Sequence, residues 1–177
     1  MTRVPAIAAT LITLATVSLA GTANASTPES TAGAPAAELA TFEGATFDMT
    51  QGWGAATACN ITDAGTTCYR TETEMNKAIA AAPGATSRAA SCSSSLRLYD
   101  GTGHTGQVIS ITTRSTLISL SGYGFDNKTS SYRVGACSAR LYNGIGSSQY
   151  PGSTSVYTSA TSMASGWNNV ISSVTLS

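Results

Sequence analysis

The second half of the chain consists of short runs in which apolar and polar side chains alternate. This two-residue period is typical of half-buried β-strands, and Gly and Asn residues separate the runs as turns do. Helical periodicity is almost absent after residue 91. The pattern therefore predicts an antiparallel all-β unit over residues 91–177, with strand candidates that include LRLY, QVISITT, SYRV, ARLY, STSVYT and VISSVTL.

Residues 39–90 carry a different set of signals, which predict two hairpins followed by one helix. The sequence TFEGATFDM alternates around a Glu-Gly turn, and ACNITDAGTTCY alternates around a turn at residues 63–65. Thr71 and Glu74 form an S/T-x-x-E capping box, and Pro83-Gly84 ends the helix that this box starts. We expect a small α+β segment whose helix packs on the neighbouring strands through one apolar face, formed by Met75, Ala78, Ile79 and Ala82.

The N-terminus has the pattern of a secretory signal peptide. After Thr2 and Arg3, the apolar run AIAATLITLATVSLA leads into an A-x-A pattern, so cleavage is expected after Ala25 and residues 1–25 are expected to be removed. Residues 26–38 are rich in Pro, Ser, Thr, Gly and Ala without hydrophobic periodicity, which predicts a flexible leader. No later stretch approaches about 18 apolar residues, so we expect a secreted, extracellular protein without a membrane partner.

The β unit is an internal duplication. CSSSLRLYDGTG recurs as CSARLYNGIG, and GFDNKTSSYRV recurs as GWNNVISSVTL. Tyr99 and Tyr142 lie 43 residues apart, and Asp126 and Asn168 lie 42 apart, so the register holds through the unit. Each half is too small to bury a core alone. The two halves are therefore expected to face each other as a β-sandwich.

Charge and composition narrow the function classes. Of 177 residues, 10% are charged, with nine basic and nine acidic side chains, and removal of residues 1–25 leaves eight against nine. Such a chain lacks the basic field that nucleic-acid binding needs. His104 is its one histidine, which leaves little for zinc or general acid-base chemistry, and Asp100 shares a single short hairpin with it. We therefore expect no nucleic-acid partner and no enzymatic activity.

The four cysteines form an even set, and thiols pair in an oxidising compartment. Three pairings can be drawn, and none of the spacings gives a C-x-x-C motif for zinc or dithiol chemistry. We favour Cys59 with Cys68, which would clip a short hairpin. The second bridge would then join Cys92 to Cys137 and close a long loop.

The duplicated unit resembles the βγ-crystallin family, whose Greek keys carry an aromatic residue, four further residues, a second aromatic, one residue and a glycine. Tyr99, His104 and Gly106 fit this spacing in the first half, so the His104 ring is expected to lie over the folded hairpin. The second half has the same order with three extra residues, at Tyr142, Tyr150 and Gly152. The resemblance covers about residues 92–177. It implies a mainly β protein, a two-Greek-key βγ-crystallin-like β-sandwich preceded by the small α+β segment.

The repeat also carries the family's calcium signature, N/D-N/D-x-x-S/T-S, twice. It reads DNKTSS over residues 126–131 and NNVISS over residues 168–173, each directly after an aromatic residue. Calcium takes about six to eight oxygen ligands, and both motifs supply oxygens. The resemblance implies two calcium sites, each assembled from both halves, with ligands from Asp126, Lys128 (by its carbonyl), Ser130, Asn168, Val170 (by its carbonyl) and Ser172.

A further carbonyl ligand is expected from each hairpin, near Thr102 in the first half, whereas the three extra residues leave its counterpart near Ile145 open. Asp126 is the one carboxylate in the two motifs. Calcium binding is therefore expected to be weak, on the order of 10⁻⁵ to 10⁻³ M. Asn and Ser at loop ends also cap turns without any ion, which is the alternative interpretation of both motifs.

Two functions of different class follow. The first is a secreted calcium-binding βγ-crystallin-like protein in which the ion stabilises the fold. The second rests on a similarity to the crystallin-fold metalloproteinase inhibitors of actinobacteria, and would make the chain a bacterial protein whose partner is an extracellular proteinase met by rigid loops. Candidate contact loops are the first hairpin of the small segment and residues 145–149. A toxin-like or cell-wall-binding module is compatible with the fold but has no specific support, and the oligomeric state is left open.

Overall fold

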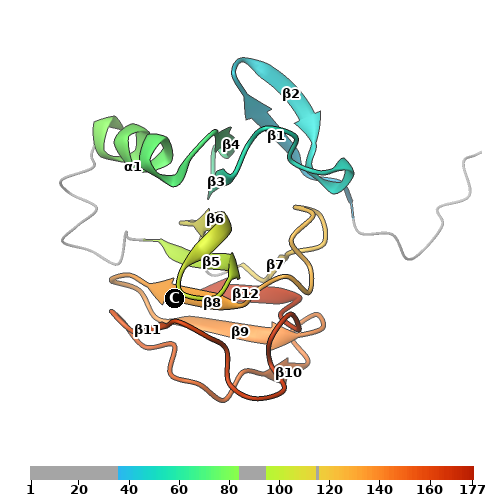
Figure 1. Cartoon of the computed structure of the whole chain (residues 1–177), viewed down its shortest axis with the longest axis vertical. Helices are drawn as coiled ribbons and strands as arrows, with labels where there is room; N and C mark the ends of the chain where they lie inside the picture. The colour runs from blue at the N-terminus through green and yellow to red at the C-terminus, as the bar shows by residue number, and fades with distance from the viewer. Residues whose placement is uncertain (1–35, 84–94, 115) are drawn as a thin grey trace, which may run out of the picture. The chain divides into compact units, whose positions relative to one another are not determined.

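The computed structural model describes residues 36–83, 95–114 and 116–177 (Figure 1). The signal peptide expected over residues 1–25, most of the leader, and Cys92 lie outside these ranges, so the predictions about them stay predictions. Within the described ranges, no helix is long and apolar enough to cross a lipid bilayer. The described chain is mainly β with one α-helix, which confirms the fold class expected from the alternating pattern.

The first segment forms the two hairpins that its sequence predicts. β1 (Leu39–Phe42) pairs antiparallel with β2 (Ala45–Asp48) around the Glu-Gly turn, and both turn residues have positive φ, as in the type I′ turns of two-residue hairpins. β3 (Ala58–Thr62) pairs antiparallel with β4 (Gly65–Tyr69). Cys59 lies directly opposite Cys68 in this second hairpin, and the two are joined by a disulfide, which confirms the first predicted bridge. Cys137 is also disulfide-bonded, and Cys92, its predicted partner, lies outside the described residues.

The helix α1 (Glu72–Ala81) begins at the predicted capping box. The Thr71 hydroxyl accepts a hydrogen bond from the Glu74 amide at 3.1 Å, and the Glu74 carboxylate accepts one from the Arg70 amide at 3.1 Å. Met75 is fully buried, and the other residues of the predicted apolar face are partly buried. The helix therefore packs through that face, against a small buried cluster formed with Ala58, Tyr99 and Val108.

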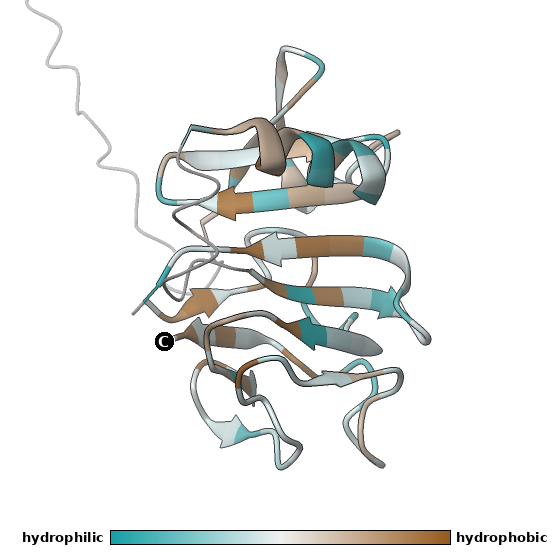
Figure 2. Ribbon diagram, turned by 90° about the vertical axis from the view of Figure 1, so that its left-hand side faces the viewer, coloured by the Kyte–Doolittle hydropathy of each residue, from teal (hydrophilic) through white to brown (hydrophobic). Residues whose placement is uncertain are grey.

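The duplicated unit contains four strands from each half. The first half supplies β5 (Leu96–Gly101), β6 (Thr105–Ile111), β7 (Ile118–Ser119) and β8 (Ser131–Val134). The second half supplies β9 (Ala139–Asn143), β10 (Ser148–Gln149), β11 (Ser159–Ala160) and β12 (Ser173–Leu176). Figure 2 shows hydrophobic residues alternating with hydrophilic ones along several of these strands, the two-residue period seen in the sequence.

The two halves exchange their third strands. One sheet contains the order β11-β8-β5-β6, so β11 of the second half pairs with β8 of the first. The other sheet has the order β10-β9-β12-β7, so β7 of the first half pairs with β12 of the second. Neither half can complete its sheet without the other, which makes the duplication a structural unit.

The first segment extends one of these sheets. β3 pairs in parallel with β6, with Ala58 opposite Val108, and the order continues through β4 and β1 to β2. The result is an eight-stranded sheet to which both segments contribute. The main buried cluster also contains side chains from both segments, including Met49, Trp53, Cys59, Leu98, Ile109, Phe125 and Leu141.

Trp53 makes an aromatic contact between the two segments. Its ring stacks on Phe125 with centres 5.5 Å apart, and its Nε1 donates to the Tyr123 carbonyl at 2.8 Å. Gly124 lies so close to the 3-10 turn at Met49–Gln51 that a Cβ there would overlap the Met49 carbonyl. The first segment thus packs directly against the residues that precede the first signature motif.

Candidate metal-binding site

The two signature motifs occupy equivalent places in the two halves. Residues 126–131 run into β8 and residues 168–173 run into β12, and the last serine of each motif is the first residue of its strand. Asn127 and Asn169, at the second position of each motif, have φ angles of 56° and 55°. Asparagine tolerates this left-handed conformation better than most residues do. The duplication read in the sequence is therefore preserved in the backbone of both loops.

Each motif is hydrogen-bonded to the other. The Ser130 hydroxyl donates to the Asn169 side-chain oxygen at 3.0 Å, and the Ser172 hydroxyl donates to the Asn127 side-chain oxygen at 3.3 Å. The backbones cross in the same way. The backbone N–H of Asn127 donates to the Ile171 carbonyl at 3.0 Å, and the backbone N–H of Asn169 donates to the Thr129 carbonyl at 2.9 Å. The contacts are reciprocal, as a pseudo-two-fold axis requires, and they bring the oxygens of both halves together.

The last serine of each motif ties the motif to the hairpin of its own half. The Ser131 hydroxyl donates to the Gly101 carbonyl at 2.6 Å and accepts from the His104 amide at 3.0 Å. Ser173 makes the equivalent two bonds in the second half, at 2.7 and 3.0 Å, with the Gly144 carbonyl and the Gly146 amide. The hairpin that carries Thr102 is thereby held beside the first motif.

One carboxylate oxygen at the crossed motifs lacks a partner. The Oδ2 atom of Asp126 accepts from the Asn127 side-chain amide at 3.1 Å, whereas Oδ1 is buried and makes no hydrogen bond within the described residues. A buried carboxylate oxygen is costly unless a cation or a donor meets it. The neighbouring Thr129 hydroxyl is likewise buried without a partner among these residues. This pair of atoms is the observation that fits a cation at the first motif.

The other predicted ligands fall into two groups. The carbonyls of Lys128 and Val170 accept no hydrogen bond from any described residue. The Thr102 carbonyl, in contrast, accepts from the Thr105 hydroxyl at 2.8 Å. Asn168 is exposed and stands where the first motif has its carboxylate. The two motifs are therefore alike in backbone and unequal in charge.

Asn127 and Asn169 are site residues that the sequence reasoning missed. The ligands were assigned to the first, third and fifth positions of each motif, whereas the crossing contacts use the amide oxygens of the second position. A signal was present, because both copies carry Asn there and Asn is enriched where φ is positive. The ligand set inferred from the family resemblance stays a prediction.

The donors at the crossed motifs suit a hard cation. Within the described residues, no group of three or more His, Cys, Asp or Glu side chains could hold a metal. An ion at the crossed motifs would meet one carboxylate together with amide, hydroxyl and carbonyl oxygens. Calcium accepts all four kinds of oxygen, so the residues present fit this ion.

The one histidine has a structural environment. The rings of His104 and Tyr99 are edge to face, with centres 5.3 Å apart. The His104 Nδ1 lies 3.2 Å from the Arg133 guanidinium, which can only donate, so the proton is assigned to Nε2, 3.1 Å from the Tyr132 carbonyl. Asp100 accepts from a backbone amide of its own hairpin at 2.7 Å. Asp100 therefore holds the hairpin closed by a hydrogen bond, and the His104 ring packs over it on Tyr99, in line with the packing role expected for His104.

Solved structures of βγ-crystallins resemble about half of the chain. A βγ-crystallin from Ciona intestinalis is 17% identical with a TM-score of 0.38, and the match covers 47% of this chain and 99% of that protein. A double mutant of a βγ-crystallin domain from Clostridium beijerinckii is 15% identical, with a TM-score of 0.37, covering 46% and 94%. Another structure of a βγ-crystallin domain from that organism is 15% identical, with a TM-score of 0.33, covering 46% and 95%.

Neither a family model nor a curated protein matches the sequence. The chain's own topology describes the fold: two four-stranded keys exchange their third strands, and the loops that enter the last strand of each key cross. The described residues from 95 to the C-terminus therefore have a two-Greek-key, βγ-crystallin-like fold.

Proposed function

We propose that this is a secreted calcium-binding protein whose βγ-crystallin-like unit holds the ion between its two halves and carries out no catalysis. The crossing of the two motifs supports the proposal, because Ser130 contacts Asn169 while Ser172 contacts Asn127. The unpartnered Asp126 oxygen beside this crossing supports it further. Bound calcium supplies a positive charge that oxygen ligands from both halves can share.

Each proposed site takes ligands from both halves. The first would use the Asp126 side chain, the Lys128 carbonyl and the Ser172 hydroxyl. The second would use Asn168, the Val170 carbonyl and Ser130. Because a carboxylate is present in the first site alone, the first site is the stronger of the two.

The consequence of binding is a gain in stability. A ligand that binds only the native state at 100 times its dissociation constant adds about 2.7 kcal/mol to the free energy of unfolding. The ion would replace serine-asparagine hydrogen bonds with bonds of its own and leave the backbone crossing in place. The protein would thus fold without calcium and become more stable with it.

Thermal unfolding of the full chain tests this proposal. Millimolar calcium should raise the melting temperature by several degrees over a chelator, and equal midpoints would contradict the proposal. Asp126→Asn keeps the shape of the side chain and should remove most of the calcium-dependent shift. The matched control is Asp63→Asn, which changes an exposed carboxylate on the β3–β4 turn and should leave the shift unchanged.

A secreted proteinase inhibitor is the second candidate, and one loop favours it. Ile145 is 61% exposed at the tip of the β9–β10 hairpin, while the flanking Gly144 and Gly146 are both hydrogen-bonded to Ser173. A braced loop that presents an apolar side chain loses little conformational freedom when a partner binds. Titration of an extracellular metalloproteinase with wild type and with Ile145→Ser tests this candidate. Full proteinase activity at a large excess of wild type would contradict it.

A further inference from the structure

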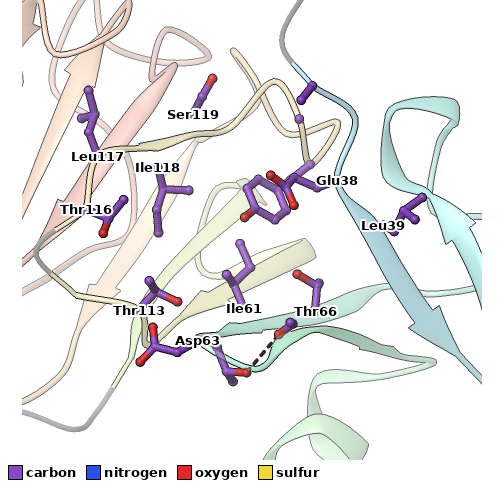
Figure 3. A pocket seen from close by; sticks show the side chains of 15 residues that line it. Glu38, Leu39, Ile61, Asp63, Thr66, Thr113, Thr116, Leu117, Ile118 and Ser119 are labelled. Atoms are coloured by element: carbon purple, nitrogen blue, oxygen red, sulfur yellow. Dashed lines mark hydrogen bonds between the residues drawn. The ribbon is translucent and has the colours of Figure 1, made fainter.

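A groove of about 680 Å³ lies apart from the crossed motifs. Residues from the start of β1, the β3–β4 turn and the segment that contains β7 line it, as Figure 3 shows. The lining residues that matter here are Glu38, Leu39, Asp63, Leu117, Ile118 and Tyr123. Neither the calcium proposal nor the inhibitor alternative uses this groove.

The groove gathers carboxylates that have no partner. The side chains of Glu38 and Asp63 take part in no hydrogen bond or ion pair within the described residues, and no basic side chain lines the groove there. Every other described carboxylate has a partner: Glu43, Asp48, Glu72, Glu74, Asp100 and Asp126. Two carboxylates that form no ion pair with any described residue, both lining one groove, favour a positively charged occupant.

The walls of the same groove are apolar. Leu39 is 60% exposed and Leu117 is 39% exposed, although both are large hydrophobic side chains. Ile61, Ile118 and Tyr123 complete this surface. Covering exposed apolar area is favourable, so an occupant with an apolar group beside its positive charge fits better than a free ion does.

One wall is a free strand edge. β7 is the end strand of its sheet and pairs with β12 on one side, while residues 116–119 line the groove. An extended chain can add to such an edge through backbone hydrogen bonds. The Thr113 hydroxyl, also in the groove lining, is buried and has no partner among the described residues. The groove therefore offers backbone and hydroxyl groups that suit a peptide.

We propose that this groove binds an extended peptide segment of a partner protein, in which a basic side chain is attracted by the negative charges of Glu38 and Asp63 and an apolar neighbour packs on the exposed leucines of the groove. The peptide backbone lies along β7. Charge selects the basic residue, and the strand edge supplies hydrogen bonds that do not depend on sequence.

The test uses acetyl-Leu-Arg-Val-amide as the probe and the full chain in chelator, so that its outcome is independent of calcium. Calorimetry measures affinity, and amide spectra of ¹⁵N-labelled protein locate the contact. Signals of residues 116–119 should shift on binding. Glu38→Gln and Asp63→Asn should each weaken binding about two- to five-fold, as expected for exposed charge pairs. The matched control is Glu43→Gln, whose carboxylate is already paired with Arg70 and lies outside the groove lining.

Two further probes separate the parts of the proposal. The citrulline analogue keeps the shape of the arginine and lacks its charge, so it should bind more weakly. Arginine amide alone should also bind more weakly, because it has no chain to lie along β7. Absence of shifts at residues 116–119, equal binding of the citrulline peptide, or equal binding of arginine amide would each overturn the proposal.

Discussion

Replacement of Trp53 by Ala tests whether the first segment and the duplicated unit fold as one. The Trp53 ring is 4% exposed, stacks on Phe125 with planes at 23°, and donates to the Tyr123 carbonyl. Phe125 directly precedes the first motif, so this contact supports the loop that carries Asp126. Loss of the Trp53–Phe125 contact should therefore destabilise the whole eight-stranded sheet.

The expected loss of stability is large. Truncation of a buried Trp to Ala costs about 3–5 kcal/mol, because apolar burial is lost and a cavity remains. The Tyr123 carbonyl also loses its donor, a hydrogen bond worth about 1 kcal/mol. Domains of this size have a total stability of about 5–15 kcal/mol, so the variant loses about a quarter of it or more. Trp53→Phe keeps an aromatic ring on Phe125 and should cost about 1–3 kcal/mol.

Urea denaturation measures both the loss and its cooperativity. The chain has two tryptophans, so Trp167 is the remaining fluorophore in Trp53→Ala and reports on the second half. Far-ultraviolet circular dichroism reports on both segments. The two probes should give one common midpoint, below that of wild type. A fluorescence midpoint equal to that of wild type, with part of the dichroism lost at lower urea, would refute the reasoning.

Three further perturbations follow from the same contacts. Gly124→Ala should lower the melting temperature more than Gly166→Ala does. Both glycines have positive φ, but only a Cβ at residue 124 would overlap a backbone carbonyl, that of Met49. The positive φ alone costs about 1–2 kcal/mol in each variant, and equal losses in the two variants would contradict the prediction. Burial raises the pKa of Tyr132 to about 12, so its neutral form stabilises the fold below about pH 10 and this stabilisation is lost as pH rises to about 12. Tyr132→Phe should remove that part of the alkaline loss, measured as stability against pH; an unchanged profile would count against it. Replacement of Cys59 and Cys68 by Ala should cost about 3 kcal/mol in urea denaturation, since the bridge closes a loop with a sequence separation of 9, and a loss near zero would contradict the entropic estimate.

Local patterns were enough to predict most of the elements. The alternating runs predicted most of the strands, Thr71 and Glu74 predicted the start of the helix, and the Cys59–Cys68 bridge was expected across a hairpin. The run STSVYT, residues 153–158, is an exception: it forms turns, in which Tyr157 has a positive φ, and the strand β11 starts only at Ser159. Each of these features depends on residues close together in the chain. The resemblance to βγ-crystallins implied that the two motifs would meet, because it assigns each calcium site to both halves.

Contacts between distant residues could not be predicted in the same way. The sequence around β6 does not indicate that this strand pairs in parallel with β3 on the side opposite β5. The alternating pattern of a strand shows which face is buried and does not show which strand lies beside it. The use of Asn127 and Asn169 in the crossing was missed for a similar reason. Their amides become partners of the serines only when two loops, one from each half, are brought within hydrogen-bond distance.

The amino-acid sequence by itself determined the mainly β class, the duplicated halves, the capped helix and one disulfide, since backbone propensities and short loops act locally. The tertiary structure alone decided the exchange of β7 and β11, the eight-stranded sheet shared by both segments, and the groove that both Glu38 and Asp63 line. These features arise from packing apolar faces and satisfying strand edges, which depend on the whole chain.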